Sequence, residues 1–160
     1  MKIRLKAVSV MQPWANRIVS GRKTIEVRNW RTSYRGPLLI VSSKKPPIPP
    51  AGYALAIATL IMCRDMTPGD EFAAQCPCER GDVAWVLDGP LWRLKPFPVT
   101  GALGIFEIER DAGYLWPTAL IRGEASQSIN RSSGLRSSMF EWLGRHLPAG
   151  SLPQHIVGRR

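Results

Sequence analysis

The residues with the clearest chemical potential lie between positions 21 and 28, where a single carboxylate, Glu26, stands between two basic residues, Lys23 and Arg28. A carboxylate among cations stays ionised, so it can accept a hydrogen bond from an exocyclic amine such as that of cytosine. The ammonium form of Lys23 is disfavoured by its basic neighbours, so this lysine can alternatively act as a base while Glu26 positions water. The spacing therefore predicts either a binding site or a hydrolytic site.

A short helix and a strand must position these residues. Gly21 is expected to end the helix, because glycine enters the left-handed cap conformation without steric cost. Residues 24–28 then alternate as a strand, which buries Ile25 and Val27 and leaves the polar side chains on the other face. Lys23 lies in the turn before the strand, from which its side chain can reach that polar face.

The net charge of +10 is unevenly distributed. Residues 1–50 contain 11 Lys and Arg and one acid, whereas residues 51–160 contain 11 of each sign, so the whole excess lies in the first third. Such a concentration favours a polyanionic partner, and nucleic acid before acidic lipid. The alternative is a solvated basic face that only maintains solubility.

Residues 29–36 form a loop rich in aromatic residues and arginines. Rings such as Trp30 and Tyr34 can stack nucleobases, while guanidinium groups such as that of Arg35 can hold phosphates. Single-stranded nucleic acid is bound by this combination. Either ring could equally close one end of a barrel, and the sequence leaves the two roles open.

Three motifs resemble the ASCH domain family, a small β-barrel family related to the PUA domains of RNA-modifying proteins. They are Ser-Val-Met-Gln-Pro-Trp-Ala at residues 9–15, Gly-Arg-Lys-Thr-Ile-Glu-Val-Arg-Asn-Trp at residues 21–30, and Tyr-Arg-Gly at residues 34–36. The Gly-x-Lys-x-x-Glu-x-Arg signature is complete, and its flanks resemble the subgroup found in transcription coactivators. The resemblance is specific over residues 5–45 and loose over residues 80–108. It implies a cleft between the first helix and the barrel, suited to RNA or a nucleoside.

The family includes nucleic-acid binders, a ribonuclease and a small amidohydrolase that removes the acyl group from N4-acetylcytidine. Lys23 matches the lysine used by the hydrolase. The hydrolase has a threonine nucleophile at the position of Glu26 in this chain, and the second acidic residue of the hydrolase has no counterpart here. This chain therefore departs from that deacylation route.

The sequence therefore predicts a module that binds RNA or single-stranded DNA, or a nucleoside, through ten residues: Gln12, Trp14, Lys23, Thr24, Glu26, Arg28, Trp30, Tyr34, Arg35 and Lys44. A hydrolase acting on RNA or on a modified nucleoside, with Lys23 and Glu26 as catalytic residues, is the alternative. In a third interpretation Glu26 and Arg28 merely pair across the sheet, and the barrel serves protein contacts. The sequence gives no prediction of oligomeric state.

The predicted fold class is α+β, a small mixed β-barrel of five to six strands (PUA-like) with two or three flanking helices. The barrel is expected to occupy residues 1–110. Glycines at positions 101 and 104 suggest bends in its last strand, as closing a small barrel requires. Residues 111–160 are expected to form a C-terminal extension with one amphipathic helix at residues 135–147 and a basic tail ending in Arg159 and Arg160.

No cofactor or metal is predicted. The three cysteines are an odd number, which does not suit a disulfide framework, and Cys76 and Cys78 lack the second Cys or His pair of a zinc site. No apolar run approaches the roughly 20 residues of a membrane span, and no signal peptide is evident. We therefore expect a cytoplasmic protein with no membrane partner.

Overall fold

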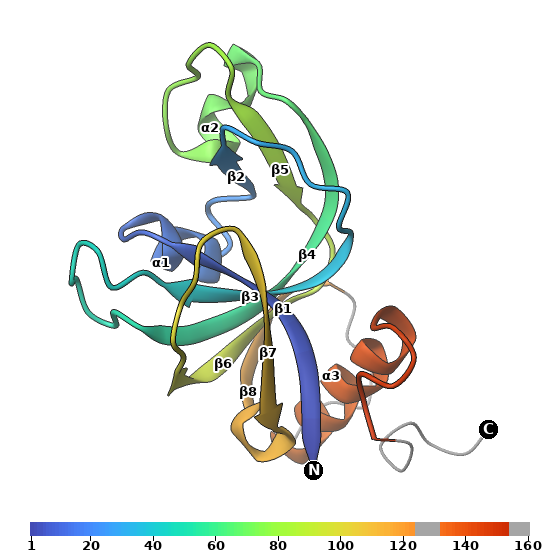
Figure 1. Ribbon diagram of the computed structural model, residues 1–160. Helices are drawn as coiled ribbons and strands as arrows, with labels where there is room; N and C mark the ends of the chain where they lie inside the picture. The colour runs from blue at the N-terminus through green and yellow to red at the C-terminus, as the bar shows by residue number, and fades with distance from the viewer. Residues whose placement is uncertain (124–131, 154–160) are drawn as a thin grey trace.

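Eight strands form a single mixed sheet in residues 1–123 and 132–153, which are the residues described by the computed structural model (Figure 1). The strands are β1 (Lys2–Val10), β2 (Ile25–Arg28), β3 (Gly36–Ser42), β4 (Tyr53–Asp65), β5 (Val83–Leu87), β6 (Leu91–Pro98), β7 (Ile105–Asp111) and β8 (Pro117–Arg122). The helices are α1 (Trp14–Val19), α2 (Glu71–Ala74) and α3 (Ser132–His146), with short 3-10 turns η1 (Pro68–Asp70) and η2 (Ala112–Tyr114). None of these helices is long and apolar enough to cross a bilayer.

The sheet curls because its longest strand, β4, has different partners along its length. The first part of β4 pairs with β6, and its last part pairs with β5. Neighbouring strands are hydrogen-bonded in the order β2-β5-β4-β3-β1-β7. Strand β6 lies outside this order and pairs with both β4 and β8. Strands β1 and β3 are parallel, and the connection between them contains α1 and β2. This connection carries the signature residues.

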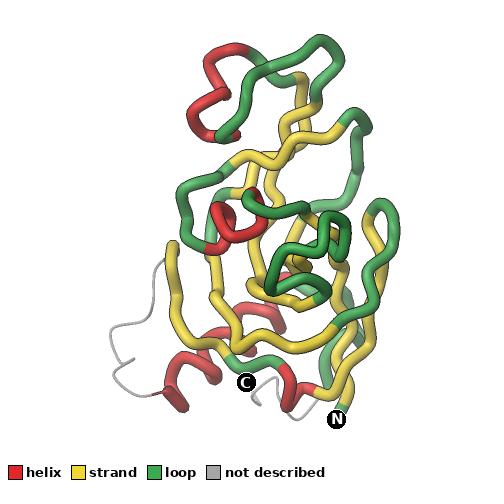
Figure 2. The backbone as a smooth tube through the Cα atoms, turned by 90° about the vertical axis from the view of Figure 1, so that its left-hand side faces the viewer, coloured by secondary structure: helices red, strands yellow, loops and turns green. Residues whose placement is uncertain are grey.

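Alternation along β3 supplies two apolar clusters on opposite faces of the sheet. Leu39 and Val41 join the first cluster, which α3 covers with residues such as Trp142. Leu38 and Ile40 join the second, which includes residues of α1. The three helices lie at different heights, with α2 at the top, α1 in the middle and α3 at the bottom (Figures 1 and 2).

The predicted α+β class with a small mixed barrel and flanking helices is confirmed, but the strand count of five to six is too low. Strand β6 continues through Pro96, although proline has no N–H to donate to a neighbouring strand. Its register against β4 shifts between Ala54 and Ala56, which leaves Pro96 outside the paired positions, and proline is tolerated at such irregularities. The glycines at positions 101 and 104 precede β7 instead of bending it, because β7 begins only at Ile105.

The predicted extension contains the eighth strand. Strand β8 pairs with β6, so the sheet continues past the expected boundary at residue 110. The expected helix at residues 135–147 is present as α3, and Met139 and Leu143 on it are fully buried. The end of the predicted basic tail, with Arg159 and Arg160, lies outside the described residues.

Candidate nucleic-acid interface

A cavity of about 230 Å³ lies between the start of α1 and strand β2. We call it the α1–β2 cavity. Its lining residues come from the end of β1, from α1, from the signature segment and from the loop after α2: Ser9, Val10, Met11, Trp14, Lys23, Glu26, Val27, Arg28 and Cys76.

Gln12 fixes the start of α1 against the sheet. Its Oε1 accepts a hydrogen bond from the backbone N of Asn16 (3.1 Å), and its Nε2 donates to Asn16 Oδ1 (3.1 Å) and to Ser42 Oγ (3.0 Å). The side chain is only 4% exposed and does not line the cavity. Gln12 therefore orients Trp14, two residues later, rather than facing the cavity itself.

Lys23 enters the cavity from the turn that Gly21 permits. Gly21 has φ +81°, and a Cβ there would lie 3.1 Å from Ile121, so both conformation and space favour glycine. Lys23 is 2% exposed, and its Nζ donates to the carbonyl of Ala74 at 2.5 Å. That carbonyl is at the C-terminal end of α2, where helix carbonyls need partners from elsewhere. Burial lowers the pKa of Lys23, against the opposing influence of Glu26.

Glu26 and Arg28 share the polar face of β2, as the alternation predicted. Glu26 is 7% exposed, its Oε1 accepts from the backbone N of Val27 (2.9 Å), and Arg28 Nε lies 3.8 Å from the same oxygen. Arg28 is held by donating from Nη2 to the carbonyl of Ser9 (2.7 Å). Its guanidinium carbon also lies 5.8 Å from the ring centroid of Trp85, within reach of a cation–π interaction.

Three buried polar atoms of the cavity residues have no hydrogen-bond partner within the described part of the chain: Trp14 Nε1, Glu26 Oε2 and Arg28 Nε. Leaving such an atom unpaired in a protein interior costs about 1–3 kcal/mol. The residues that line the cavity thus carry one unpartnered acceptor and two unpartnered donors, all three of them buried.

The ASCH domain family model matches residues 8–116, a range that contains every residue of the α1–β2 cavity. The chain belongs to the ASCH domain family. Among curated proteins, Activating signal cointegrator 1 from Homo sapiens is 48% identical over 42 residues, which are 26% of this chain and 7% of that protein. This ASCH domain therefore matches only a small part of that relative's length.

Solved structures similar to this ASCH domain include two mutant proteins of ZmASCH from Zymomonas mobilis. One is 13% identical with a TM-score of 0.49, and the alignment covers 64% of this chain and 88% of that chain. The other is 14% identical with a TM-score of 0.47, and the alignment covers 64% and 87%.

Two predicted stacking residues of the ASCH domain, Trp30 and Tyr34, are half-buried and contact neighbouring residues of the domain. The ring of Trp30 meets Trp85 edge-to-face at 4.7 Å, and the Trp30 carbonyl accepts from Trp85 Nε1 at 3.2 Å. The Tyr34 hydroxyl donates to the carbonyl of Pro37, and burial raises the pKa of Tyr34 to about 12. Both rings pack against the second apolar cluster, which matches the alternative role of closing the barrel.

The remaining predicted residues also lie outside the α1–β2 cavity. Thr24 lines a separate hollow beside α2, and exposed Arg35 donates from Nη1 to the carbonyls of Thr32 and Tyr34. Lys44 is exposed and lines a third hollow, which shares Ser9 with the cavity. The structure therefore brings together four of the ten predicted residues: Trp14, Lys23, Glu26 and Arg28.

Sequence reasoning missed Cys76 as a cavity residue. It comes from the loop after α2, about fifty positions from Lys23, and no local pattern links the two segments. Burial raises the pKa of its thiol, and all three cysteines are free. Within the described residues, no three or more His, Cys, Asp or Glu side chains group to hold a metal ion.

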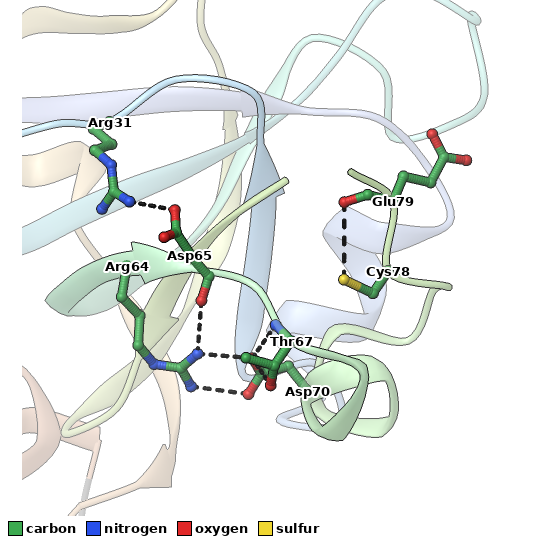
Figure 3. Close-up of polar contacts among 7 residues, drawn as sticks. All are labelled: Arg31, Arg64, Asp65, Thr67, Asp70, Cys78 and Glu79. Atoms are coloured by element: carbon green, nitrogen blue, oxygen red, sulfur yellow. Dashed lines mark hydrogen bonds and ion pairs between the residues drawn. The ribbon is translucent and has the colours of Figure 1, made fainter. Parts of the chain in front are cut away.

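A clamp at the end of β4 holds α2, and therefore the carbonyl that binds Lys23 (Figure 3). Arg64 donates from Nη1 and Nη2 to the two carboxylate oxygens of Asp70 at 2.7 and 2.8 Å. The backbone N and Oγ1 of Thr67 donate to Asp70 Oδ2 at 2.9 and 3.0 Å. The bonds from Arg64 and Thr67 hold the pKa of Asp70 well below its usual range. The single turn of α2 is thus anchored by a charge-assisted network.

Proposed function

We propose that the α1–β2 cavity binds one base of RNA or single-stranded DNA, or a free nucleoside. The cavity, at about 230 Å³, is smaller than the roughly 300–1,000 Å³ of sites for drug-sized ligands, so its occupant is a small group. The observation that carries the proposal is the set of three unpartnered polar atoms on Trp14, Glu26 and Arg28.

A nucleobase offers complementary groups at this scale. Glu26 Oε2 can accept from an exocyclic amine, while Trp14 Nε1 and Arg28 Nε can donate to ring nitrogens or carbonyl oxygens. Unstacked bases of single strands expose these edges, whereas bases in a duplex do not. Single-stranded nucleic acid therefore suits the cavity better than duplex.

The charge around the cavity also favours this ligand class. Two cations, Lys23 and Arg28, line the cavity with one carboxylate, Glu26, and Arg17 lies close enough to influence the pKa of Lys23. A phosphate backbone that crosses this region would gain electrostatic attraction and release counterions. The affinity should consequently fall steeply as the salt concentration rises.

Fluorescence anisotropy with labelled six-residue RNA and DNA single strands tests the proposal. We expect Glu26→Gln to weaken binding about tenfold or more, because the amide cannot accept as a carboxylate does and adds a competing donor. Glu109→Gln is the matched control, because Glu109 lies on β7 and is not a cavity residue. Salt-independent binding, or equal affinity of the Glu26→Gln variant and the unaltered protein, would contradict the proposal.

A hydrolase is the second candidate, and the burial of Lys23 favours it. A lysine with a lowered pKa can hold a neutral amine, take a proton from water and so generate a nucleophile, while Glu26 orients that water. Turnover of N4-acetylcytidine or of a labelled RNA is the assay. Activity that disappears in Lys23→Met and in Glu26→Gln, with unchanged circular dichroism, would establish catalysis, and absence of turnover with both substrates would refute it.

A further inference from the structure

Phe72 is an exposed aromatic residue on an otherwise firmly held turn. Its side chain is 86% exposed. It lines a hollow of about 460 Å³, which we call the Phe72 hollow, formed by the signature turn and α2: Gly21, Arg22, Thr24, Phe72, Ala73 and Gln75. The α1–β2 cavity does not include Phe72, and the function proposed above gives this residue no role.

The Phe72 hollow and the α1–β2 cavity both take lining residues from two segments, residues 21–24 and 72–76. Lys23 and Cys76 line the cavity, while their chain neighbours line the hollow. The segments are joined by hydrogen bonds from Thr24 N to the Ala73 carbonyl (2.9 Å) and from Lys23 Nζ to the Ala74 carbonyl. The α1–β2 cavity and the Phe72 hollow therefore adjoin the same pair of hydrogen-bonded segments.

The backbone on either side of Phe72 is held before any ligand arrives. Asp70, two residues earlier, is bound by Arg64 and Thr67 (Figure 3). On the other side, Glu71 Oε1 accepts from the backbone N of Cys78 at 2.8 Å. Because this backbone is already ordered, only the side-chain torsions of Phe72 have to be ordered when its ring stacks on a base.

The charge of the Phe72 hollow suits an anion. None of its six lining residues is acidic. Arg22 is exposed and forms no ion pair within residues 1–123 and 132–153, and its Nε donates only a long hydrogen bond to Ser20 Oγ, at 3.4 Å. Arg17 adds a second guanidinium nearby, where its Nη1 donates to the Gln75 carbonyl.

We propose that the Phe72 hollow binds a second nucleotide of a single-stranded nucleic acid whose neighbouring base lies in the α1–β2 cavity. Phe72 stacks the second base, and Arg22 binds the phosphate that connects the two nucleotides. This inference rests on the proposed function and makes it more specific, because the ligand is then a strand of at least two nucleotides rather than a free nucleoside.

A length series tests the inference. The probes are cytidine 5′-monophosphate, the dinucleotide cytidylyl-cytidine and hexacytidylate, measured by calorimetry with the full chain. We expect the dinucleotide to bind at least tenfold more tightly than the monophosphate. Phe72→Ala should weaken binding of the dinucleotide and the hexamer about fivefold or more and leave the affinity for the monophosphate unchanged. Phe72→Trp should keep the higher affinity for the dinucleotide. Arg22→Ala should flatten the salt dependence for the hexamer.

Two matched controls accompany these variants. Leu103, on the connection between β6 and β7, is 99% exposed, so Leu103→Ala removes an apolar side chain of similar exposure outside the hollow. Lys95→Ala removes an exposed charge on β6. Neither should change the affinity for the dinucleotide. Unchanged circular dichroism in Phe72→Ala would show that the fold is retained.

The outcomes separate the two proposals. If the monophosphate binds but greater length adds no affinity and Phe72→Ala has no effect, the inference is overturned while the function of the α1–β2 cavity stands. Phe72 would then be free to contact a protein partner. If the unaltered protein binds neither the monophosphate nor the hexamer, both proposals fail.

Discussion

Two groups of basic residues in the first third of the chain behave differently. On β1, Lys2, Arg4 and Lys6 face β7, where Glu109 and Glu107 form ion pairs with them at 3.0, 3.1 and 3.2 Å. The antiparallel register places Arg4 opposite Glu109 and Lys6 opposite Glu107. On the surface of this strand pair, two carboxylates thus neutralise most of the charge of three cations.

Around the α1–β2 cavity the balance is different. Lys23 is buried against a backbone carbonyl, and Arg28 is held by another carbonyl and by a ring. The single carboxylate there, Glu26, keeps one oxygen without a hydrogen-bond partner among the described residues. Under the proposed function, the basic residues of the first third attract a ligand only where no acidic strand is paired alongside them.

The largest expected effect is on binding affinity, and it distinguishes Lys23 in the cavity from Lys6 on β1. We expect Lys23→Met to weaken binding of a six-residue single strand by about thirtyfold or more, since it removes a cation from the cavity. The free energy of unfolding should change by no more than about 1 kcal/mol, because the lost hydrogen bond to Ala74 is offset by removal of a desolvated amine. Anisotropy and chemical denaturation measure the two effects, and Lys6→Met should alter neither.

Stability should also depend on pH through Lys23. Burial lowers its pKa from the ordinary 10.5, so in the alkaline range below that value the unfolded chain binds more protons at this site than the folded chain. This contribution makes stability rise with pH toward 10.5. Denaturation curves of Lys23→Met should lack that rise, and identical pH profiles for the two proteins would contradict the assigned burial.

The clamp at the end of β4 should give the next largest effect. Asp70→Asn is expected to reduce the free energy of unfolding by about 2 kcal/mol at neutral pH, because it weakens bonds to a buried carboxylate. The pKa of Asp70 is depressed, so its stabilisation is complete above its ordinary value of 3.8 and is lost as pH falls below it. The difference between the two proteins should therefore shrink in acid. Asp65→Asn is the control, since the Asp65 side chain is 84% exposed.

A smaller effect concerns the salt dependence of binding. Arg28→Ala should reduce the slope of log affinity against log salt by about 0.7, the value for one phosphate contact on a single strand. Arg4→Ala should leave the slope unchanged, because Arg4 is engaged by Glu109. Equal slopes for both variants would mean that Arg4 on β1 and Arg28 in the cavity attract the ligand alike.

The smallest effect is expected on β7. Glu109→Gln removes a carboxylate that bridges Lys2 and Arg4 on an exposed surface, where such pairs contribute little. The denaturation midpoint should not change measurably at physiological salt. A clear loss of stability would show that the ion pairs between β1 and β7 stabilise the fold as well as neutralise charge.

The features that the sequence predicts well are local. Gly21 ends α1, and Ile25 and Glu26 face opposite sides of β2, because these properties follow from neighbouring residues. The spacing of apolar residues likewise predicts α3. Strand β8 was not expected, since its burial pattern shows no clear alternation and its partner β6 is distant in sequence.

The site could be predicted only in part, because its remaining features depend on distant contacts. Trp30 and Tyr34 have the composition of stacking residues, but Trp85 and Pro37 engage them. Phe72 has no neighbouring arginine in the sequence. It lines the same hollow as Arg22 only because α2 packs on β2. The ion pairs of β1 with β7 likewise arise from strand register, which charge counting does not reveal.

The apolar clusters on both faces of the sheet also affect the cooperativity of unfolding. Strands β1, β3 and β4 each contribute side chains to both apolar clusters, so neither cluster can lose its packing while the other remains intact. We expect one denaturation transition for the chain. A fragment that ends at residue 110 would lack β8 and α3 and expose the apolar residues beneath them, such as Trp92 and Leu94, and would be a poor substitute for the whole in ligand studies.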